Sequence, residues 1–390
     1  MKLADIRGLL PSPDDYAYFQ TGGFSPKPKP VIDEVKRWLE FQAKGPALNE
    51  VHASMAEMLE ATRAEVAAAI NADVDEIMLN ENTTIGINVV ATGFDWQPGD
   101  IVILSDHEHP GNRIPWYNLA QRRGIKLRFL SMTNDQATLL DELDTFLAEG
   151  PRLIAISHVS RRSGLRLPAK AIISRAHAVS VPVMLDGAQS FGAIPVDVRD
   201  LDCDFYAFSG HKYIMGPQAT GGFYVRKDRL ETLFPSWVGS HSQQEMDMHG
   251  KLVLLDSAKR FEFGTRNLAD QAGFCYALRM WRDIGWENVF AQLEAYTDHL
   301  KQALLTVPGL VLETPLPYAQ SSGTVVFHIP GLTASDISNS LLEEERVLVS
   351  PLEFNPRSIR ISAHVFNNES DAERLITGVQ RIAERQKDVL

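Results

Sequence analysis

The chain has 390 residues, of which 44% are hydrophobic and 23% are charged, and its formal net charge is −12. These values are ordinary for a globular protein long enough for more than one domain. The acidic balance argues against a general nucleic-acid binder, which needs a basic face. No apolar run approaches the ~18 residues of a membrane span. We therefore expect neither a nucleic-acid partner nor insertion into a membrane.

Cysteine usage and the first residues both bear on the cellular compartment. Only Cys203 and Cys275 occur, which excludes a disulfide framework and favours a reducing compartment. The opening residues, MKLADIRGLLPSPDD, have neither the apolar core of a signal peptide nor the composition of a transit peptide. The expected location is the cytoplasm.

In chain order, two helices are predicted first, in residues 31–43 and 54–70. From about residue 75, short apolar runs alternate with segments of helical periodicity, which include 112–123, 138–148 and 168–179. The predicted strands are EIML, DIVIL, KLRFL, RLIAIS, VPVMLD, DFYAF and GGFYV. This alternation predicts an α/β fold with a mostly parallel sheet.

The pattern changes after a long helical segment at about 269–306. GTVVFHI, VLVS and SIRIS predict short strands, and a closing helix is expected at 369–387. We expect a smaller α+β domain here. The predicted division is an N-terminal segment, 1–20, that packs with the small domain, a large domain, 21–270, and a small C-terminal domain, 271–390.

Polar side chains follow four of the predicted strands at the point where each strand ends. These are Thr83 and Thr84, His109, Asp186, and the group Ser209, His211 and Lys212. In a parallel sheet the carboxyl ends of the strands form one crevice, where ligands collect. We therefore expect these side chains to converge on one site.

The convergent set suits an aldehyde cofactor with an anionic tail. The amine of Lys212 can bind an aldehyde covalently, and Thr83 and Thr84 at a helix N-terminus offer hydroxyl and N–H groups to a phosphate. The carboxylate of Asp186 could keep a pyridine nitrogen protonated, and His109 offers a flat ring on which to stack. Pyridoxal phosphate (PLP) fits all of these roles.

Each residue type also has a simpler interpretation. An isolated lysine is usually solvated, and Asp, Thr and Gly-Gly at these places are common in caps and turns. His107 and His109 with Glu108 between them suggest a metal site only weakly, because no cysteine or carboxylate cluster completes it. No metal is expected.

Seven stretches in order make the chain resemble the class V aminotransferase group of fold-type I PLP enzymes. That group includes cysteine desulfurases, selenocysteine lyases and isopenicillin N epimerase. The stretches extend over roughly residues 17–385, and they are NENTTIGINVVATG, DHEHPGN, SHVSRRSGLRLP, VMLDGAQSFGAIPVDV, DFYAFSGHKYIMGPQATGGFYV, RFEFGTRN and SIRISAHVFNNESDAERL. The resemblance implies a large domain with a mostly parallel, seven-stranded sheet and a small α+β domain.

The resemblance also implies roles for single residues. Lys212 would bind the cofactor covalently, Asp186 would contact its ring nitrogen, and His109 would stack on the ring. Gln189 would contact the ring hydroxyl. The phosphate would be held by Thr84, Ser209 and His211, with Thr83 beside them.

Further residues correspond to the substrate mouth and to a subunit interface. Arg360 would grip the substrate α-carboxylate, with Arg357 as a nearby competitor, and Gly22 and Gly23 would lie at the mouth. Thr265 would reach the phosphate of a neighbouring subunit, so a homodimer with shared sites is expected.

A departure from the family narrows the reaction. Persulfide-forming desulfurases need a loop cysteine upstream of the carboxylate arginine, and no cysteine lies between Gly323 and Arg360. The resemblance is strongest to the cystine C–S lyase branch, in which a small amino acid is cleaved at Cβ by β-elimination without an enzyme cysteine. Aminotransferase and epimerase reactions remain alternatives, because Lys212 could serve them equally.

Two other classes fit less well. A non-catalytic protein would have little reason to keep both Lys212 and Asp186, and a nicotinamide-dependent dehydrogenase should show G-x-G-x-x-G, which EIMLNENTTIG lacks. In SHVSRRSG, Arg161 and Arg162 stand where desulfurases carry an asparagine near the cofactor. They are either solvated charges, or one of them, taken as Arg161, binds a second acidic group on the substrate.

Overall fold

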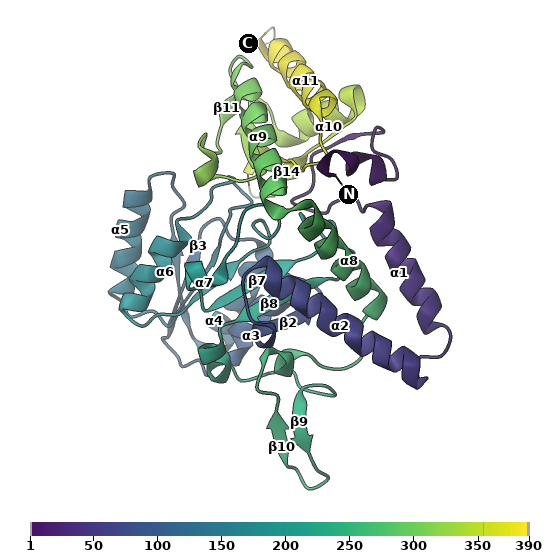
Figure 1. Ribbon diagram of the computed structural model, residues 1–390. Coiled ribbons are helices and arrows are strands. Elements are labelled where there is room, and N and C mark those ends of the chain that lie inside the picture. The colour runs from purple at the N-terminus through teal and green to yellow at the C-terminus, as the bar shows by residue number, and fades with distance from the viewer. Residues whose placement is uncertain (1, 354, 388–390) are drawn as a thin grey trace.

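The computed structural model describes residues 2–353 and 355–387. A seven-stranded sheet forms the centre of the large domain, in the order β2-β8-β7-β6-β5-β3-β4 (Figure 1). β8 runs in the direction opposite to the other six strands. The strands are β2 (Ile77–Asn80), β3 (Ile101–Ser105), β4 (Lys126–Leu130), β5 (Leu153–Ser157), β6 (Val183–Asp186), β7 (Phe205–Ser209) and β8 (Gly221–Val225).

The burial of the strands explains their sequences. Every residue of β3, β5, β6 and β7 is buried, as expected for strands covered on both faces by helices, and their runs are almost continuously apolar. The edge strand β4 is largely accessible, and it carries Lys126 and Arg128. The helices of this domain are α2 (Asn49–Ala69), α3 (Thr83–Gly93), α4 (Ile114–Arg123), α5 (Gln136–Leu147), α6 (Ala169–Ala178) and α7 (Val198–Leu201).

The long helical segment predicted at 269–306 is two helices. α8 (Leu268–Ile284) packs against α1 (Lys29–Gln42) and α2, and α9 (Trp286–Leu305) leads to the small domain. Gly285 separates them with φ +94° and ψ 116°, a conformation that ends a helix and that other residues rarely adopt. The apolar period continues on both sides of Gly285, which is why the sequence pattern does not reveal the break.

The small domain contains an antiparallel sheet of four strands in the order β11-β12-β15-β14. Its strands are β11 (Val311–Leu312), β12 (Thr324–His328), β14 (Ser350–Leu352) and β15 (Asn355–Ser362), and its further helices are α10 (Ala334–Glu345) and α11 (Glu369–Lys387). Near the top of Figure 1, the N-terminal segment lies beside this domain. There β1 (Ala17–Tyr18) pairs in parallel with β13 (Val347–Leu348).

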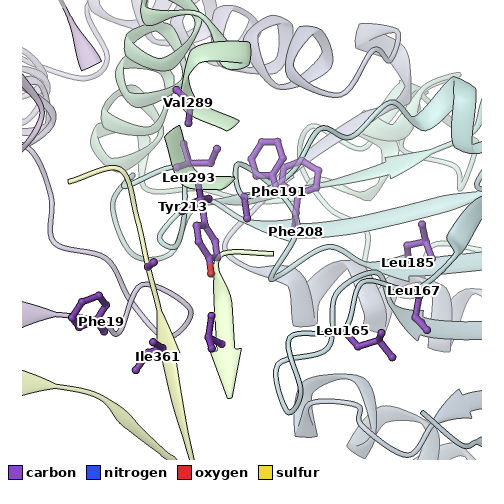
Figure 2. Close-up of a cluster of buried hydrophobic side chains, with 14 of the residues drawn as sticks. Phe19, Leu165, Leu167, Leu185, Phe191, Phe208, Tyr213, Val289, Leu293 and Ile361 are labelled. Carbon is purple, nitrogen blue, oxygen red and sulfur yellow. The ribbon is translucent and has the colours of Figure 1, made fainter. Parts of the chain in front are cut away.

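One hydrophobic core joins the two domains. Figure 2 shows Phe191 and Phe208 of the large domain close to Leu293 of α9, with Tyr213 beside them. Ile361 of β15 and Phe19 of the N-terminal segment belong to the same buried cluster. Because this core is continuous, the carboxyl end of β7 is fixed against the small domain.

A hairpin of β9 (Gln243–Met246) and β10 (Leu252–Leu254) projects from the large domain, at the bottom of Figure 1. Its residues are mostly exposed on both faces. Among the described helices, none combines the length and the apolar character needed to cross a membrane.

Candidate active site

The carboxyl ends of β5, β6 and β7 meet in one place. Ser157 of β5 pairs with Asp186 of β6, and Asp186 pairs with Ala207 of β7. Two residues after β7 ends at Ser209, the chain carries His211 and Lys212. The charges of Asp186 and Arg360 both act on the pKa of Lys212, which Asp186 raises and Arg360 lowers. The structure thus gathers the polar residues from strand ends that are far apart in sequence.

The turn that bears Lys212 is fixed on both sides. Gly216 N–H donates to the carbonyl of Gly210 at 2.9 Å, which closes the turn. The next residue, Tyr213, is buried, and its hydroxyl lies 3.1 Å from Thr324 Oγ1 of β12. His364 Nε2 lies 2.9 Å from the Tyr213 carbonyl oxygen. Contacts from the small domain therefore hold the backbone that aims Lys212.

The opposite charges of Lys212 and Asp186 each favour the ionised form of the other residue. Burial lowers the pKa of Lys212 to about 8, and the partly compensating effect of Asp186 keeps it from falling further. Burial raises the pKa of Asp186. Smaller effects lower it, among them a hydrogen bond from the N–H of Ala188 to Asp186 Oδ1 at 2.9 Å and the charge of Lys212. A lysine with a lowered pKa supplies the neutral amine that attack on an aldehyde requires.

His109 follows β3 and presents an exposed side chain at the site. Its Nδ1 accepts a hydrogen bond from Gly111 N–H at 2.9 Å, so the proton of the neutral ring is on Nε2. Removal of water from around the ring lowers the pKa of His109, and the cations Arg161, Lys212 and Arg360 lower it further. A neutral, fixed imidazole is suited to stacking on an aromatic ring.

The residues predicted to hold phosphate lie at the start of α3 and after β7. Ser209 Oγ accepts from Thr83 N–H at 3.0 Å and lies 2.8 Å from Thr83 Oγ1, so these two hydroxyls are joined. Thr84 lies so close to Gly111 that a Cβ there would come within 2.5 Å of Thr84 Oγ1. His211 Nδ1 is buried and has no hydrogen-bond partner in the part of the chain that the structure describes. The helix N-terminus, Thr84 and His211 could together accept an anion.

Buried polar atoms of five residues at or beside the predicted site lack hydrogen-bond partners among the described residues, and this tests whether the site fits a polar cofactor and substrate. They are Thr21 Oγ1, Gln189 Oε1, His211 Nδ1, Arg360 Nε and Ser362 Oγ. Buried polar groups in folded proteins are nearly always hydrogen-bonded. A bound polar group would satisfy these atoms, and the hydroxyl, amide, imidazole and guanidinium groups present fit PLP with an amino acid.

The N-terminal loop closes one side of the crevice. Gln189 Nε2 donates to the carbonyl oxygen of Gly22 at 2.8 Å. A Cβ on Gly22 would lie 2.6 Å from Ser362 Oγ and 2.8 Å from Gln189 Oε1, so only glycine fits there. Gly23 lies near Arg360, whose Nη2 would be 3.9 Å from a Cβ at that position.

Two arginines enter the site. Arg360 on β15 is 4% exposed, and burial followed by repulsion from Arg161 lowers its pKa to about 10. The Arg161 side chain is 17% exposed. Its positive charge lowers the pKa values of His109, Asp186 and Lys212, so its guanidinium lies near these groups. Arg162 instead donates a hydrogen bond to the carbonyl of Asp106 at 3.1 Å.

Glu108 is a buried acidic residue whose importance the sequence did not reveal. β3 and β5 pair only at Val102–Leu153 and Ile103–Ile154, and beyond these pairs the two strands separate. The Glu108 carboxylate lies between their ends. It accepts from Ser105 Oγ at 2.5 Å, Ser157 N at 2.8 Å, Ser157 Oγ at 2.6 Å and Asn112 Nδ2 at 2.7 Å. It therefore stabilises the opening of the sheet beside Asp186.

Some predicted residues lie apart from this group. Thr265 is exposed, and it lines a surface cavity of about 400 Å³ with Glu81, Ile85 and Trp237. Cys203 and Cys275 are buried free thiols, in the large-domain core and in α8. Burial raises the pKa of both thiols, so they are poor nucleophiles.

The family model "Aminotransferase class-V" matches residues 17–375. A cysteine desulfurase of Pectobacterium atrosepticum is 33% identical, with 94% of this chain and 93% of that protein aligned. A cysteine desulfurase of Escherichia coli O127:H6 is 32% identical over the same shares of the two chains. These similarities extend over nearly the whole length of each protein.

Solved structures agree. A cystine C–S lyase in complex with its product cysteine persulfide has a TM-score of 0.88 and 28% identity, covering 95% of this chain and 99% of that one. The apo structure of a cysteine desulfurase from Thermococcus onnurineus NA1 has a TM-score of 0.88 and 26% identity, with 98% of both chains covered. The matches confirm the family resemblance and the α/β fold predicted from the sequence.

Proposed function

This chain belongs to the aminotransferase class-V family, and from that premise we propose that it is a PLP-dependent lyase that breaks a C–S bond of a cysteine-type amino acid by β-elimination. Family membership confirms the prediction that PLP is the cofactor. The named activities of the relatives, cysteine desulfurase and cystine C–S lyase, both cleave a C–S bond and support a lyase.

Bound PLP would supply an aldehyde that condenses with amines and a ring that withdraws electrons from the substrate Cα. Lys212 would hold the aldehyde until substrate arrives, and its freed Nζ would then remove the Cα proton. Asp186 would keep the proton on the ring nitrogen, and His109 would fix the plane of the ring. Arg360 would bind the α-carboxylate beside Gly22 and Gly23.

The burial of both thiols is the observation that favours elimination without an enzyme cysteine. Neither Cys203 nor Cys275 lies on the small-domain segment before Arg360, and both are core residues with raised pKa values. A sulfur leaving group would therefore depart with its bonding electrons as a thiolate or persulfide. Hydrolysis of the remaining three-carbon unit would give pyruvate and ammonia.

We further propose a homodimer in which Thr265 contributes to the site of the neighbouring subunit. Exposed apolar side chains near Thr265 support this proposal: Trp237 is 69% exposed and Phe234 is 77% exposed. Trp237 packs on Phe263 with ring centroids 5.6 Å apart. The cytoplasmic location and the division at residues 20 and 270 stay predictions, the former supported by the two free thiols.

The test is product analysis with purified, PLP-loaded protein. Incubation with cystine or cysteine should release pyruvate and ammonia, and borohydride should fix the cofactor to Lys212. Lys212→Ala should lose pyruvate release by orders of magnitude, whereas Cys203→Ala and Cys275→Ala should keep it.

The alternatives give different products. Amino-group transfer to a 2-oxo acid, or inversion at Cα without pyruvate, would replace the lyase proposal by an aminotransferase or an epimerase. Loss of activity in either cysteine variant, with an unchanged melting temperature, would show that an enzyme thiol takes part.

A further inference from the structure

The turn that carries Arg161 is rigid. Ser160 Oγ accepts from the N–H groups of Arg162 at 3.1 Å and Ser163 at 3.3 Å, and it lies 3.1 Å from His107 Nδ1. Gly164 has φ +70°, and a Cβ there would lie 2.3 Å from the carbonyl oxygen of Thr324. Arg161 is therefore presented by a turn clamped between the large domain and β12.

The Arg161 guanidinium is incompletely paired. Its side chain is 17% exposed, and its Nε is buried without a hydrogen-bond partner. The single ion pair found for it in the described chain is with Glu353, where Nη1 and Oε2 are 3.3 Å apart. The Glu353 side chain is 60% exposed, so this contact is a weak one at the rim.

The charge balance of the crevice favours more than one anionic group. Lys212, Arg161 and Arg360 carry positive charge, and Asp186 is the acidic group among them. A buried cation without a paired anion is costly. One α-carboxylate can satisfy Arg360 in a bidentate manner, and the cofactor phosphate is assigned above to Thr84, His211 and the start of α3. Among the described residues this leaves Arg161 with the exposed Glu353.

Resting on the function proposed above, we propose that Arg161 binds a second, side-chain anionic group of the substrate, so that the enzyme prefers amino acids with two acidic groups over neutral ones. Glu353 pairs with the Arg161 guanidinium until the second acidic group of the substrate takes its place. Cystine, which carries a distal carboxylate on its leaving half, belongs to this class of substrate.

Two matched comparisons test the preference. The first compares KM and kcat for cystine with those for the mixed disulfide of cysteine and cysteamine, which lacks only the distal carboxylate. The second measures calorimetric binding of glutamate and glutamine to the PLP-loaded protein and needs no C–S cleavage. The wild type should favour the acidic member of each pair by about tenfold or more, the usual worth of a hydrogen bond to a charged group.

Arg161→Gln should abolish this preference while it leaves the neutral member of each pair unchanged, and Arg161→Lys should restore part of it. Arg162→Gln is the control, since the Arg162 guanidinium is hydrogen-bonded to the carbonyl of Asp106, and it should retain the preference. Glu353→Gln should strengthen binding of the acidic members, because the competing carboxylate is removed.

Equal weakening of acidic and neutral ligands in Arg161→Gln would overturn the proposal, because Arg161 would then contact the cofactor or the α-carboxylate. Equal binding of glutamate and glutamine to the wild type would overturn it as well. Failure to release pyruvate from cystine, with the calorimetric preference intact, would instead count against the proposed lyase reaction alone.

Discussion

Glu108 shows how one buried residue shapes the crevice. Where β3 and β5 stop pairing, the N–H of Ser157 would face an open gap. The Glu108 carboxylate accepts this N–H and also binds the side chains of Ser105 and Asn112. Burial, followed by the nearby charge of Asp186, raises its pKa to about 7. Glu108 is therefore a positioning residue, and it directly precedes His109.

Glu108→Gln should reveal this raised pKa as a pH-dependent stability difference. An acid whose pKa is about 7 when folded and near 4.5 when unfolded stabilises the protein most below pH 4.5. As pH rises from 4.5 to 7, the unfolded state loses this proton first, so wild-type stability should fall relative to Glu108→Gln. The fall should amount to a few kcal/mol at most, measured as melting temperatures across this pH range.

A matched control separates this effect from the lost hydrogen bonds. Glu108→Gln places an amide donor toward Asn112 Nδ2, which lowers stability by about 1–3 kcal/mol at every pH. Glu57→Gln, on the exposed face of α2, should change neither the stability nor its dependence on pH appreciably. A constant offset between the wild type and Glu108→Gln from pH 4.5 to 7 would contradict the raised pKa.

At the scale of elements, the N-terminal loop matters as much as the strand ends. Gly22 lies between Gln189 of the large domain and Ser362 of β15, at distances that leave no room for a Cβ. Gly22→Ala should move the loop or Gln189 by a few tenths of an ångström or more. We expect a fall in kcat/KM for cystine of about tenfold or more and a loss of about 1–3 kcal/mol in stability.

Gly8→Ala is the control for that substitution. Gly8 is exposed, and a Cβ there would meet nothing within 4 Å. Its kinetic constants and melting temperature should match the wild type. If Gly22→Ala also matched the wild type in kcat/KM, the loop would not contribute to the substrate mouth.

The elements that the sequence predicted correctly are those with a strong local pattern. β3, β5, β6 and β7 are fully buried, and burial on both faces explains why each is an almost continuous apolar run that the sequence reveals. The hairpin β9–β10 escaped prediction because it is exposed on both faces and lacks apolar alternation. The break at Gly285 escaped because a backbone angle, not the apolar period, ends α8.

The site residues divide in the same way, into those that a local sequence pattern reveals and those that it does not. Lys212, Asp186 and His109 could be proposed because Asp186 ends a predicted strand and the other two come within five residues of the end of one. The positions of Glu108 and Glu353 could not, because each has a partner on a distant segment: Ser157 is 49 residues from Glu108, and Arg161 is 192 residues from Glu353. Only the folded chain brings these groups together.

At the scale of the whole molecule, several large apolar side chains are exposed to water on one face. Phe234, Trp237 and Val238 are 77%, 69% and 48% exposed and close together in sequence, and Thr265 lies in the cavity beside Trp237. Apolar surface concentrated in this way is typical of a face that binds another protein. If that partner is a second copy of the chain, the interface and the active site depend on one another.

Trp237→Asp should therefore weaken both assembly and cofactor binding. A buried charge at an interface, with loss of an aromatic anchor, should raise the dimer dissociation constant by at least about 30-fold, as expected for an interfacial tryptophan worth about 2 kcal/mol or more. Analytical ultracentrifugation should show monomer at micromolar protein. Under the proposed role of Thr265 at the neighbouring site, PLP should also be released more readily. Val179→Asp, at a 53% exposed valine after α6, should leave both unchanged. Retention of the dimer in Trp237→Asp would exclude this face as the interface, whereas monomers that hold PLP as tightly as the wild type would exclude the shared site.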